Sequence, residues 1–319
     1  MRTKEPIHIP QFRIPEEHQE VINNYVDELL HSGCIVRSSS PYNSPMFCVK
    51  KHDGSLRVVQ DFRAINEASL DSKYTTKEVQ ECVDTIGRMR STIFSTLDLT
   101  SGFWQMALAP DSREQTAFSI AGRGRFHWVV APMGLKASPS SFQRLMDYVM
   151  MDLAHVQSYI DDVMIHSEDP ETHLVHLRQA FDRIRAFNLK LNLDKCDFAK
   201  REINYLGHTL SAEGITPNLD KIKAVKNYPM PSTIKAIREF HGLVNYFRSH
   251  IRNFSLLSGQ LTKLIKKDSG WKGGALPPAA EIAFNKLKEQ LCTAPMLAYP
   301  MKGVPYRVSV DAATGDEDN

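Results

Sequence analysis

The chain has 319 residues, of which 42% are hydrophobic and 24% charged, and its net charge is +2. This balance excludes a disordered or fibrous chain and is typical of a globular protein with two or three subdomains. No apolar stretch reaches the roughly eighteen residues of a membrane span, and no secretion signal opens the chain. Five scattered cysteines without a CxxC pair argue against a zinc site or a disulfide framework, so a reducing setting is expected.

A helix is expected over residues 16–32, where apolar residues recur at helical spacing after a proline suited to a first turn. Two short strands follow at residues 46–50 and 56–60. The sequence His52-Asp53-Gly54 lies between them and is typical of a hairpin. The first part of the chain therefore predicts a helix followed by a β-hairpin.

A strand rich in β-branched and apolar residues is expected at residues 91–99, and Asp98 lies at its end. Two more strand-like runs lie within residues 115–130, separated by a turn at Gly122-Arg123-Gly124. A strong helix begins at Ser138-Pro139, with serine as N-cap and proline at the first position. Five apolar residues are expected on its buried face: Phe142, Leu145, Met146, Val149 and Leu153.

A turn at Asp161-Asp162 is expected between two short apolar strands. A helix over residues 170–187 follows, and then a strand pair over residues 202–211. Four residues are expected to be buried by that helix: Leu174, Leu177, Phe181 and Ile184.

Three histidines lie close together in this region, at His166, His173 and His176. A metal site is conceivable, but no third and fourth ligand is evident beside the helical pair. Surface histidines are therefore the favoured interpretation.

After Thr216-Pro217 the sequence changes to helices with many basic residues. Between residues 221 and 267 there is one acidic residue, Glu239, and the basic residues are Lys221, Lys223, Lys226, Lys235, Arg238, Arg248, Arg252, Lys263, Lys266 and Lys267. Such a local positive charge suits a polyanion, and a solvated helical surface is an equally good explanation. A loop over residues 268–280, a helix over 281–291 and a strand over 306–310 are expected next.

Adjacent aspartates at a hairpin tip repel each other unless a cation lies between them. For Asp161 and Asp162 alone, a polar turn is the simpler interpretation. Asp98 changes this balance, because paired antiparallel strands could bring all three carboxylates to one sheet edge. Three carboxylates suit hard divalent cations such as Mg²⁺, and two ions about 3.5–4 Å apart can serve phosphoryl transfer.

A triphosphate also needs cations from the protein, and Lys51 and Arg57 flank the first hairpin. Arginine offers a planar fork to phosphate oxygens and lysine a point charge. Considered alone, this segment would be an exposed basic hairpin.

Six motifs occur in order along the chain. They are RVVQDFRAIN at 57–66, FSTLDLTSGFWQ at 94–105, PMGLKASPSSFQ at 132–143, YIDD at 159–162, LKLN at 189–192 with Lys195-Cys196, and YLGH at 205–208. The set resembles the reverse transcriptases of gypsy-type long-terminal-repeat retrotransposons, which are related to retroviral polymerases. The resemblance covers about residues 10–311, and six ordered motifs are far more specific than YIDD alone.

The resemblance implies an α+β fold, a right-hand polymerase of fingers, palm and thumb with a mostly antiparallel palm sheet, a connection segment and the start of an RNase H-like domain. The expected divisions are residues 1–90 for the N-terminal segment and fingers, 91–211 for the palm with interleaved fingers segments, 212–270 for the thumb, 271–300 for a connection-like linker and helix, and 301–319 for an incomplete RNase H-like start.

The resemblance also implies an RNA-directed DNA polymerase that uses two Mg²⁺ ions, with Mn²⁺ as a substitute, held by Asp98, Asp161 and Asp162. Its expected partners are deoxynucleoside triphosphates and an RNA or DNA template with primer, but no membrane. The residues implied to bind the nucleotide are Lys51, Arg57, Phe103 and Gln143, and Phe103 would act as a steric gate against ribonucleotides. The residues implied to bind template or primer are Gly134, Tyr159, Tyr205, Leu206, Gly207 and His208.

The resemblance also bears on four further residues, Asp61, Arg63, Met133 and Asp311. Asp61 and Arg63 would brace the fingers. Met133 departs from the phenylalanine or glutamine usual in related enzymes, which leaves the nucleotide contacts there open. Asp311 matches the first carboxylate of an RNase H domain, but the others would lie beyond Asn319, so no RNase H activity is expected.

The chain therefore resembles a piece of a Pol polyprotein, expected in the cytoplasm or in virus-like particles inside the cell. The alternative is a catalytically incompetent, nucleic-acid-binding remnant of a truncated retroelement. The intact carboxylates and the intact Lys51 and Arg57 favour the enzyme.

Overall fold

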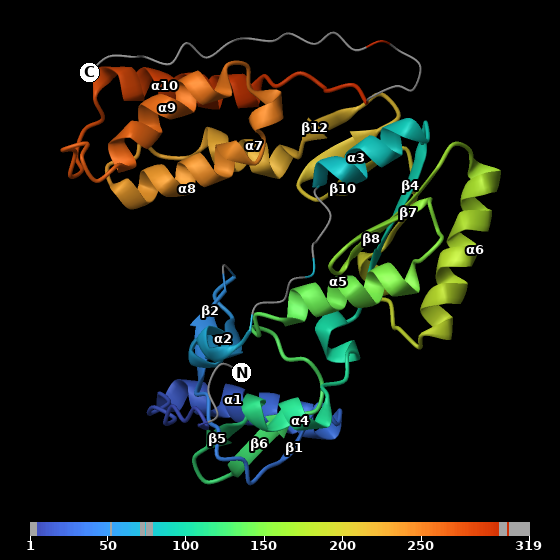
Figure 1. The fold of residues 1–319 in the computed structure, drawn as a ribbon, viewed down its shortest axis with the longest axis vertical. Helices are drawn as coiled ribbons and strands as arrows, with labels where there is room; N and C mark the ends of the chain where they lie inside the picture. Colours follow the sequence, from blue (N-terminus) through green and yellow to red (C-terminus); the bar gives the residue numbers. More distant parts are fainter. Residues whose placement is uncertain (1–4, 52, 71–73, 75–78, 300–304, 306–319) are drawn as a thin grey trace. The chain divides into compact units, whose positions relative to one another are not determined.

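The computed structural model describes residues 5–51, 53–70, 74, 79–299 and 305 (Figure 1). The chain forms two compact units. Unit 1 consists of residues 1–78 with 93–206, and unit 2 consists of residues 79–92 with 207–319. The strand expected at 306–310 and the carboxylate of Asp311 lie outside the described residues.

Unit 1 begins with helices and short strands around one core. These are α1 (Glu16–His31), β1 (Ile35–Arg37), β2 (Met46–Lys50), β3 (Leu56–Gln60), α2 (Arg63–Ala68), α4 (Pro110–Arg113), β5 (Phe118–Ile120) and β6 (Gly124–Trp128). The predicted first helix, the β2–β3 hairpin and the two later strands are confirmed. The face of α1 that carries Val26 packs in one core with Phe118 and Phe126, and β1, β6 and β5 form a separate antiparallel sheet.

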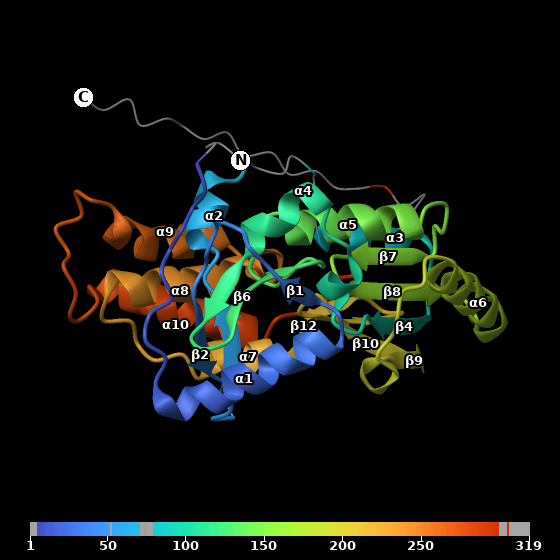
Figure 2. The same ribbon diagram turned by 90° about the horizontal axis from the view of Figure 1, so that it is seen from below.

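A second sheet of unit 1 has the strand order β7-β8-β4-β9, and every neighbouring pair is antiparallel (Figure 2). Its strands are β4 (Ile93–Asp98), β7 (Val156–Tyr159), β8 (Asp162–Ser167) and β9 (Asp197–Lys200). Unit 1 also contains α5 (Ser138–Val149), α6 (Pro170–Ala186), β10 (Glu202–Tyr205) and the short 3-10 turn η1 (Gly102–Gln105). Leu97 and Val163 from the sheet pack with Phe142 of α5 and Ile184 of α6 in one core. The strand ending at Asp98 and the hairpin around Asp161-Asp162 therefore belong to one sheet, as the strand pattern predicted.

Most residues of the two predicted helix faces are buried, and one residue of each, Leu174 and Leu153, differs from the prediction. Leu174 is 69% exposed, and the buried stripe of α6 runs through His173, Leu177, Ala180 and Ile184. His173 takes the buried position next to Leu174 because the hydroxyls of Ser95 and Ser167 satisfy its ring nitrogens. At the other helix, α5 ends at Val149, so Leu153 packs against the core from the following turn rather than from the helix.

Unit 2 contains α3 (Val79–Arg88), β11 (His208–Ser211), β12 (Ile215–Pro217), α7 (Leu219–Lys226), α8 (Ile234–Asn245), α9 (Phe254–Ile265) and α10 (Pro278–Cys292). Ile237 and Phe240 of α8 are buried beside Leu261 of α9 and Phe284 of α10. Because α10 shares this core, the expected division near residue 270 is not a break in packing. Residues 79–92 also belong to this unit, although the sequence assigned them mostly to the fingers.

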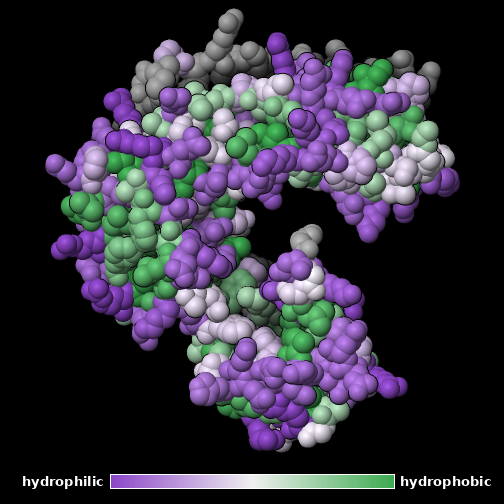
Figure 3. All heavy atoms as spheres, turned by 180° about the vertical axis from the view of Figure 1, so that it is seen from behind, coloured by the Kyte–Doolittle hydropathy of each residue, from purple (hydrophilic) through white to green (hydrophobic). Residues whose placement is uncertain are grey.

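In the described part of the chain, no helix combines the length and the apolar character needed to cross a bilayer. On the face shown in Figure 3, hydrophobic patches are interrupted by hydrophilic side chains. All five cysteines are free thiols.

Candidate active site

Three predicted carboxylates meet at one edge of the β7-β8-β4-β9 sheet. Asp98 at the end of β4 lies directly opposite Asp162 at the start of β8. Tyr159 pairs with Asp162 across the β7–β8 hairpin, so the two-residue turn between them is Ile160-Asp161. The antiparallel register thus places Asp98 opposite Asp162, and Asp161 directly precedes Asp162 in the turn. All three residues therefore lie at the same end of neighbouring strands.

The electrostatics at this edge show an unbalanced negative charge. Partial loss of hydration, together with the charges of Asp161 and Asp98, raises the pKa of Asp162. The residue still keeps an exposed surface, so its carboxylate is accessible from solvent. Nζ of the Lys195 ammonium lies 3.8 Å from Oδ1 of Asp98. Both groups of that pair keep substantial exposure, so it is weak in water.

This donor set fits a magnesium site that is completed by substrate. No group of three or more His, Cys, Asp or Glu side chains in the described residues is close enough to hold an ion by itself. Mg²⁺ usually takes one or two carboxylates and fills its remaining positions with water and substrate phosphates. Partial loss of hydration and then the charges of Asp161 and Asp98 raise the pKa of Asp162, and a bound cation would stabilise its charged form.

Gln143 lies beneath the carboxylate turn and is fully buried. Its Oε1 accepts a hydrogen bond of 2.6 Å from the N–H of Ile160, and its Nε2 donates to the carbonyl of Ser158 at 3.1 Å. Nε2 also lies 3.0 Å from Oδ1 of Asp147. Gln143, which is predicted to bind the nucleotide, therefore holds the turn that carries Asp161. Its amide is fully buried and does not face a nucleotide site directly.

Gly102 and Phe103 lie beside the same turn. A side chain on Gly102 would meet the ring of Phe142 at 3.2 Å and the Cβ of Asp161 at 3.6 Å, so glycine allows this close packing. The ring of Phe103 packs edge-on against Phe142 with 5.6 Å between centroids. The predicted gate residue is therefore held by a buried aromatic partner next to the carboxylates.

Lys51, Arg57 and Gly134 come together around one cavity of about 760 Å³ in unit 1. The turn between β2 and β3 is closed by the N–H of Lys51, which donates to the carbonyl of Ser55 at 2.8 Å. Nη2 of Arg57 lies 3.0 Å from the sulfur of Met133, which also lines the cavity. Two exposed cations and a flexible thioether thus border this cavity, and its lining residues do not include the three carboxylates or Phe103.

Asn66 is the last residue of the motif at 57–66, and the sequence predicts no role for it. Its amide donates to the carbonyl of Gly134 at 2.8 Å, and its Oδ1 accepts from the N–H of Lys136 at 2.8 Å. Gly134 has a φ of +97°, which glycine adopts without strain. Asn66 therefore fixes the loop that carries a predicted template contact, and the same loop lines a second cavity of about 880 Å³.

The predicted brace between Asp61 and Arg63 is a bidentate pair with contacts of 2.6 Å and 2.9 Å. The Arg63 guanidinium lowers the pKa of the Asp61 carboxyl. Asp61 Oδ1 also accepts the N–H of Arg63 at 3.0 Å at the start of α2. The pair organises the turn that leads from β3 into this helix.

The predicted primer segment divides between the two units. In unit 1, Tyr205 is buried and its hydroxyl lies 3.4 Å from the carbonyl of Gln157, while Leu206 has a φ of 47°. In unit 2, Gly207 has a φ of +73° and faces the ring of Tyr246, which a Cβ would meet at 3.3 Å. His208 is buried, and its ring lies 5.4 Å from that of Tyr246.

The expectation of surface histidines is wrong. His166 and His173 are buried, and His155 stacks on His176 with 3.6 Å between ring centroids. Ser167 Oγ lies 2.8 Å from Nδ1 of both His173 and His176, and Ser95 Oγ lies 2.7 Å from Nε2 of His173. Hydroxyl groups from β4 and β8 thus satisfy both ring nitrogens of His173, which is why this polar residue can share the buried stripe of α6 with Leu177 and Ile184.

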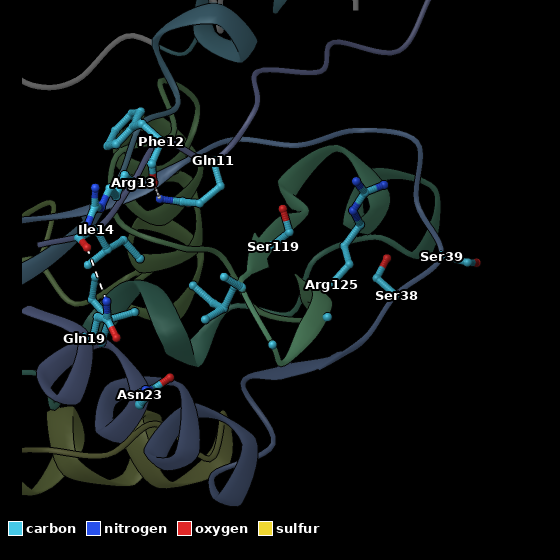
Figure 4. A pocket seen from close by; sticks show the side chains of 15 residues that line it. Gln11, Phe12, Arg13, Ile14, Gln19, Asn23, Ser38, Ser39, Ser119 and Arg125 are labelled. Carbon is cyan, nitrogen blue, oxygen red and sulfur yellow. Dashed lines mark hydrogen bonds between the residues drawn. The ribbon is translucent and has the colours of Figure 1, made fainter. Parts of the chain in front are cut away.

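Figure 4 shows another cavity, of about 750 Å³, between the N-terminal segment, α1 and the β5–β6 hairpin. The Nε2 of Gln19 reaches the carbonyl of Ile14 across its wall. The residues that line it include none of the predicted site residues. We assign it no role in the carboxylate site.

A family model described as reverse transcriptase (RNA-dependent DNA polymerase) matches residues 49–210, just over half of the chain. The matched span contains Lys51, Arg57 and all three carboxylates. The chain belongs to this family.

Several relatives of the reverse transcriptase family are similar over nearly the whole chain. The Retrovirus-related Pol polyprotein from transposon 297 of Drosophila melanogaster is 36% identical over 315 residues, which are 97% of this chain and 29% of that protein. The corresponding polyprotein from transposon gypsy of the same organism is 31% identical over 313 residues, covering 92% of this chain and 30% of that protein. The chain thus spans less than a third of the curated relatives it matches.

A solved structure of the foamy viral protease-reverse transcriptase dRH in complex with ds DNA superposes with a TM-score of 0.83. The two are 25% identical, and the match covers 93% of this chain and 52% of that one. The expected polymerase fold, with mixed helices and antiparallel sheets, is confirmed by this likeness.

Proposed function

We propose that this chain is an RNA-directed DNA polymerase that adds deoxynucleotides to the 3′-hydroxyl of a primer. The observation that carries the proposal is the register that sets Asp98 opposite Asp162 at the edge where Asp161 leaves its turn. Family membership supports the reaction type, and the cavity beside Lys51 and Arg57 supports a triphosphate as substrate.

In the proposed reaction the primer 3′-oxygen bonds to the α-phosphorus of the nucleotide. The bond from that phosphorus to the pyrophosphate oxygen breaks, pyrophosphate leaves, and the hydroxyl proton passes to solvent water. Mg²⁺ held by Asp98, Asp161 and Asp162 would activate the attacking oxygen and neutralise charge on the leaving pyrophosphate. Lys51 and Arg57 would bind the outer phosphate oxygens, with the arginine fork giving direction and the lysine a point charge.

Selection of deoxynucleotides falls to Phe103 in this proposal. Its ring is held edge-on by Phe142, so it cannot move away easily to admit a 2′-hydroxyl. The partners would be a template with primer, RNA or DNA, bound mainly through its phosphates. Phosphate contacts carry no sequence information, so binding should be insensitive to template sequence and sensitive to salt.

A primer-extension assay tests the proposal. A homopolymer RNA template with a complementary DNA primer is incubated with the chain, Mg²⁺ and the matching deoxynucleotide, and duplex binding is followed by fluorescence anisotropy in the same buffer. Extension of the primer is the expected result. Binding without extension would support the alternative, a nucleic-acid-binding remnant, and would overturn the proposed activity.

A further inference from the structure

Asp98 lies at the end of β4, beyond the point where the ladder to β9 stops. β9 pairs with β4 only at Phe94 and Thr96, with a register shift between them. The backbone of Asp98 is met instead by residues 190–196, which we call the bracing segment. The N–H of Asn192 donates to the carbonyl of Asp98 at 2.9 Å, so the segment continues the edge that β9 leaves.

Cys196 closes the bracing segment against Asp98. The N–H of Asp98 donates to Sγ of Cys196 at 3.4 Å, and the thiol donates to the carbonyl of Asn192 at 3.2 Å. A short turn, η3 (Leu193–Lys195), joins the two residues. Sulfur is a weak acceptor, so this hydrogen bond adds little energy. Its effect is on position, because one thiol contacts both the backbone of Asp98 and the bracing segment that pairs with it.

Gln105 fastens the other end of the bracing segment. Its amide donates to the carbonyls of Thr100 at 2.7 Å and Lys190 at 3.0 Å, and its own carbonyl accepts from the N–H of Lys190 at 2.7 Å. The N–H of Thr100 also donates to the carbonyl of Lys190 at 3.0 Å. One side chain thus ties the chain that leaves Asp98 to the start of the bracing segment.

We infer that Gln105 and Cys196 are positioning residues for Asp98, acting by fixing the bracing segment against the end of β4. The inference rests on the proposed polymerase function. Mg²⁺ demands nearly octahedral oxygen ligands at about 2.0–2.1 Å, so the carboxylate must be held closely. A displacement of a catalytic group by about 1 Å can lower the rate roughly 100-fold. Hydrogen bonds that hold the backbone of Asp98 can therefore affect catalysis although they do not touch the substrate.

Binding of Mn²⁺ to the protein in complex with a template, a primer that lacks its 3′-hydroxyl and the matching deoxynucleotide, followed by electron paramagnetic resonance, tests the inference without turnover. Gln105→Leu keeps a similar volume and removes the three hydrogen bonds, and Gln179→Leu on the exposed side of α6 is the matched control. The Mn²⁺ concentration at half-saturation should rise about fivefold or more in Gln105→Leu, the size expected from one lost hydrogen bond. The control should match the wild type.

A second pair of variants answers the question if Gln105→Leu does not fold. Cys196→Ala should weaken Mn²⁺ binding, and Cys196→Ser, which keeps a donor and an acceptor, should recover part of it. In extension assays the same variants should need more Mg²⁺, with an unchanged KM for the nucleotide. A purely structural role would lower the melting temperature and leave Mn²⁺ affinity unchanged.

The outcomes separate the inference from the proposed function. If the wild type binds Mn²⁺ no better than Asp161→Asn and does not extend a primer, the proposed function fails. If the wild type binds Mn²⁺ and extends, while Gln105→Leu and Cys196→Ala bind Mn²⁺ equally well, the proposed function stands and the positioning role is overturned.

Discussion

The backbone N–H of Ile160 donates a hydrogen bond of 2.6 Å to the side-chain carbonyl of Gln143. Ile160 has a φ of 55°, a left-handed conformation that a β-branched residue rarely adopts. Because Asp161 follows directly, this strained residue sets the direction in which the carboxylate leaves the turn. Strain of this kind costs about 1–3 kcal/mol and persists only where the surroundings hold it in place.

Replacing Gln143 with leucine should therefore slow nucleotide addition more than it weakens duplex binding. Loss of the amide frees Ile160 to relax, and a shift of about 1 Å in Asp161 would reduce the rate roughly 100-fold. Single-nucleotide incorporation measures the rate, and anisotropy measures duplex affinity. With Gln179→Leu as control, an unchanged rate in Gln143→Leu would remove the supporting role.

Replacing Phe103 with alanine should admit ribonucleotides. The ring is fixed by Phe142, so its removal opens space that a 2′-hydroxyl can occupy. Discrimination between deoxynucleotide and ribonucleotide, measured as a ratio of kcat/KM values, should fall about tenfold or more, the scale of one steric contact. Phe198→Ala, at an exposed position, is the control. If Phe103→Ala discriminates between deoxynucleotides and ribonucleotides as well as the wild type does, Phe103 is not the residue that excludes ribonucleotides.

Replacing Arg57 with alanine should raise the KM for the nucleotide. A charge-assisted hydrogen bond is worth about 1.5–3 kcal/mol, so the expected rise is roughly 10- to 100-fold. Arg178→Ala on α6 removes an exposed arginine away from the cavity and should have no such effect. A KM that is the same in Arg57→Ala and in the control would exclude a phosphate contact at this residue.

The histidine cluster predicts loss of stability in acid. Burial and the neighbouring His176 lower the pKa of His155 to about 4, and burial chiefly lowers the pKa of His166 to about 3. Both folded values lie below the unfolded value near 6.5, so the unfolded chain binds more protons. The stabilisation is complete above about pH 6.5 and is lost as the pH falls toward the folded pKa.

Between pH 7.5 and 5.5 each such histidine should contribute about 1 kcal/mol to the loss in the free energy of unfolding. Urea denaturation at the two pH values measures this change. His155→Phe keeps a ring to stack on His176, and it removes a buried Nε2 that has no hydrogen-bond partner in the structure. The variant should show a smaller difference between the two pH values, and an equal difference would contradict the linkage.

Local patterns predicted the elements that carry the chemistry. The apolar strand ending at Asp98 and the hairpin at Asp161-Asp162 were visible because alternation and turn residues are local signals, and the sheet pairs them in one register. The β2–β3 hairpin with Lys51 and Arg57 was visible for the same reason. The motif resemblance then supplied the roles that spacing alone could not give.

Buried polar contacts were not predictable from the sequence. Gln143 and His173 are polar, so neither would be assigned to a core without knowledge of their partners, which lie up to 78 residues away at Ser95. Gln105 likewise acts on Lys190, a contact that only the assembled sheet creates. The placement of residues 79–92 in unit 2 is also long-range and has no local signal.

Replacing Asp161 with asparagine tests the central claim most directly. Asparagine keeps the size and the turn position but removes the charge that would hold Mg²⁺. The measurement is Mg²⁺-dependent extension of a DNA primer on a homopolymer RNA template, with melting temperature and duplex affinity recorded for the same protein. The account predicts that extension is abolished while folding and duplex binding stay near wild-type values. Undiminished extension by Asp161→Asn would contradict the assignment of these carboxylates as the catalytic site.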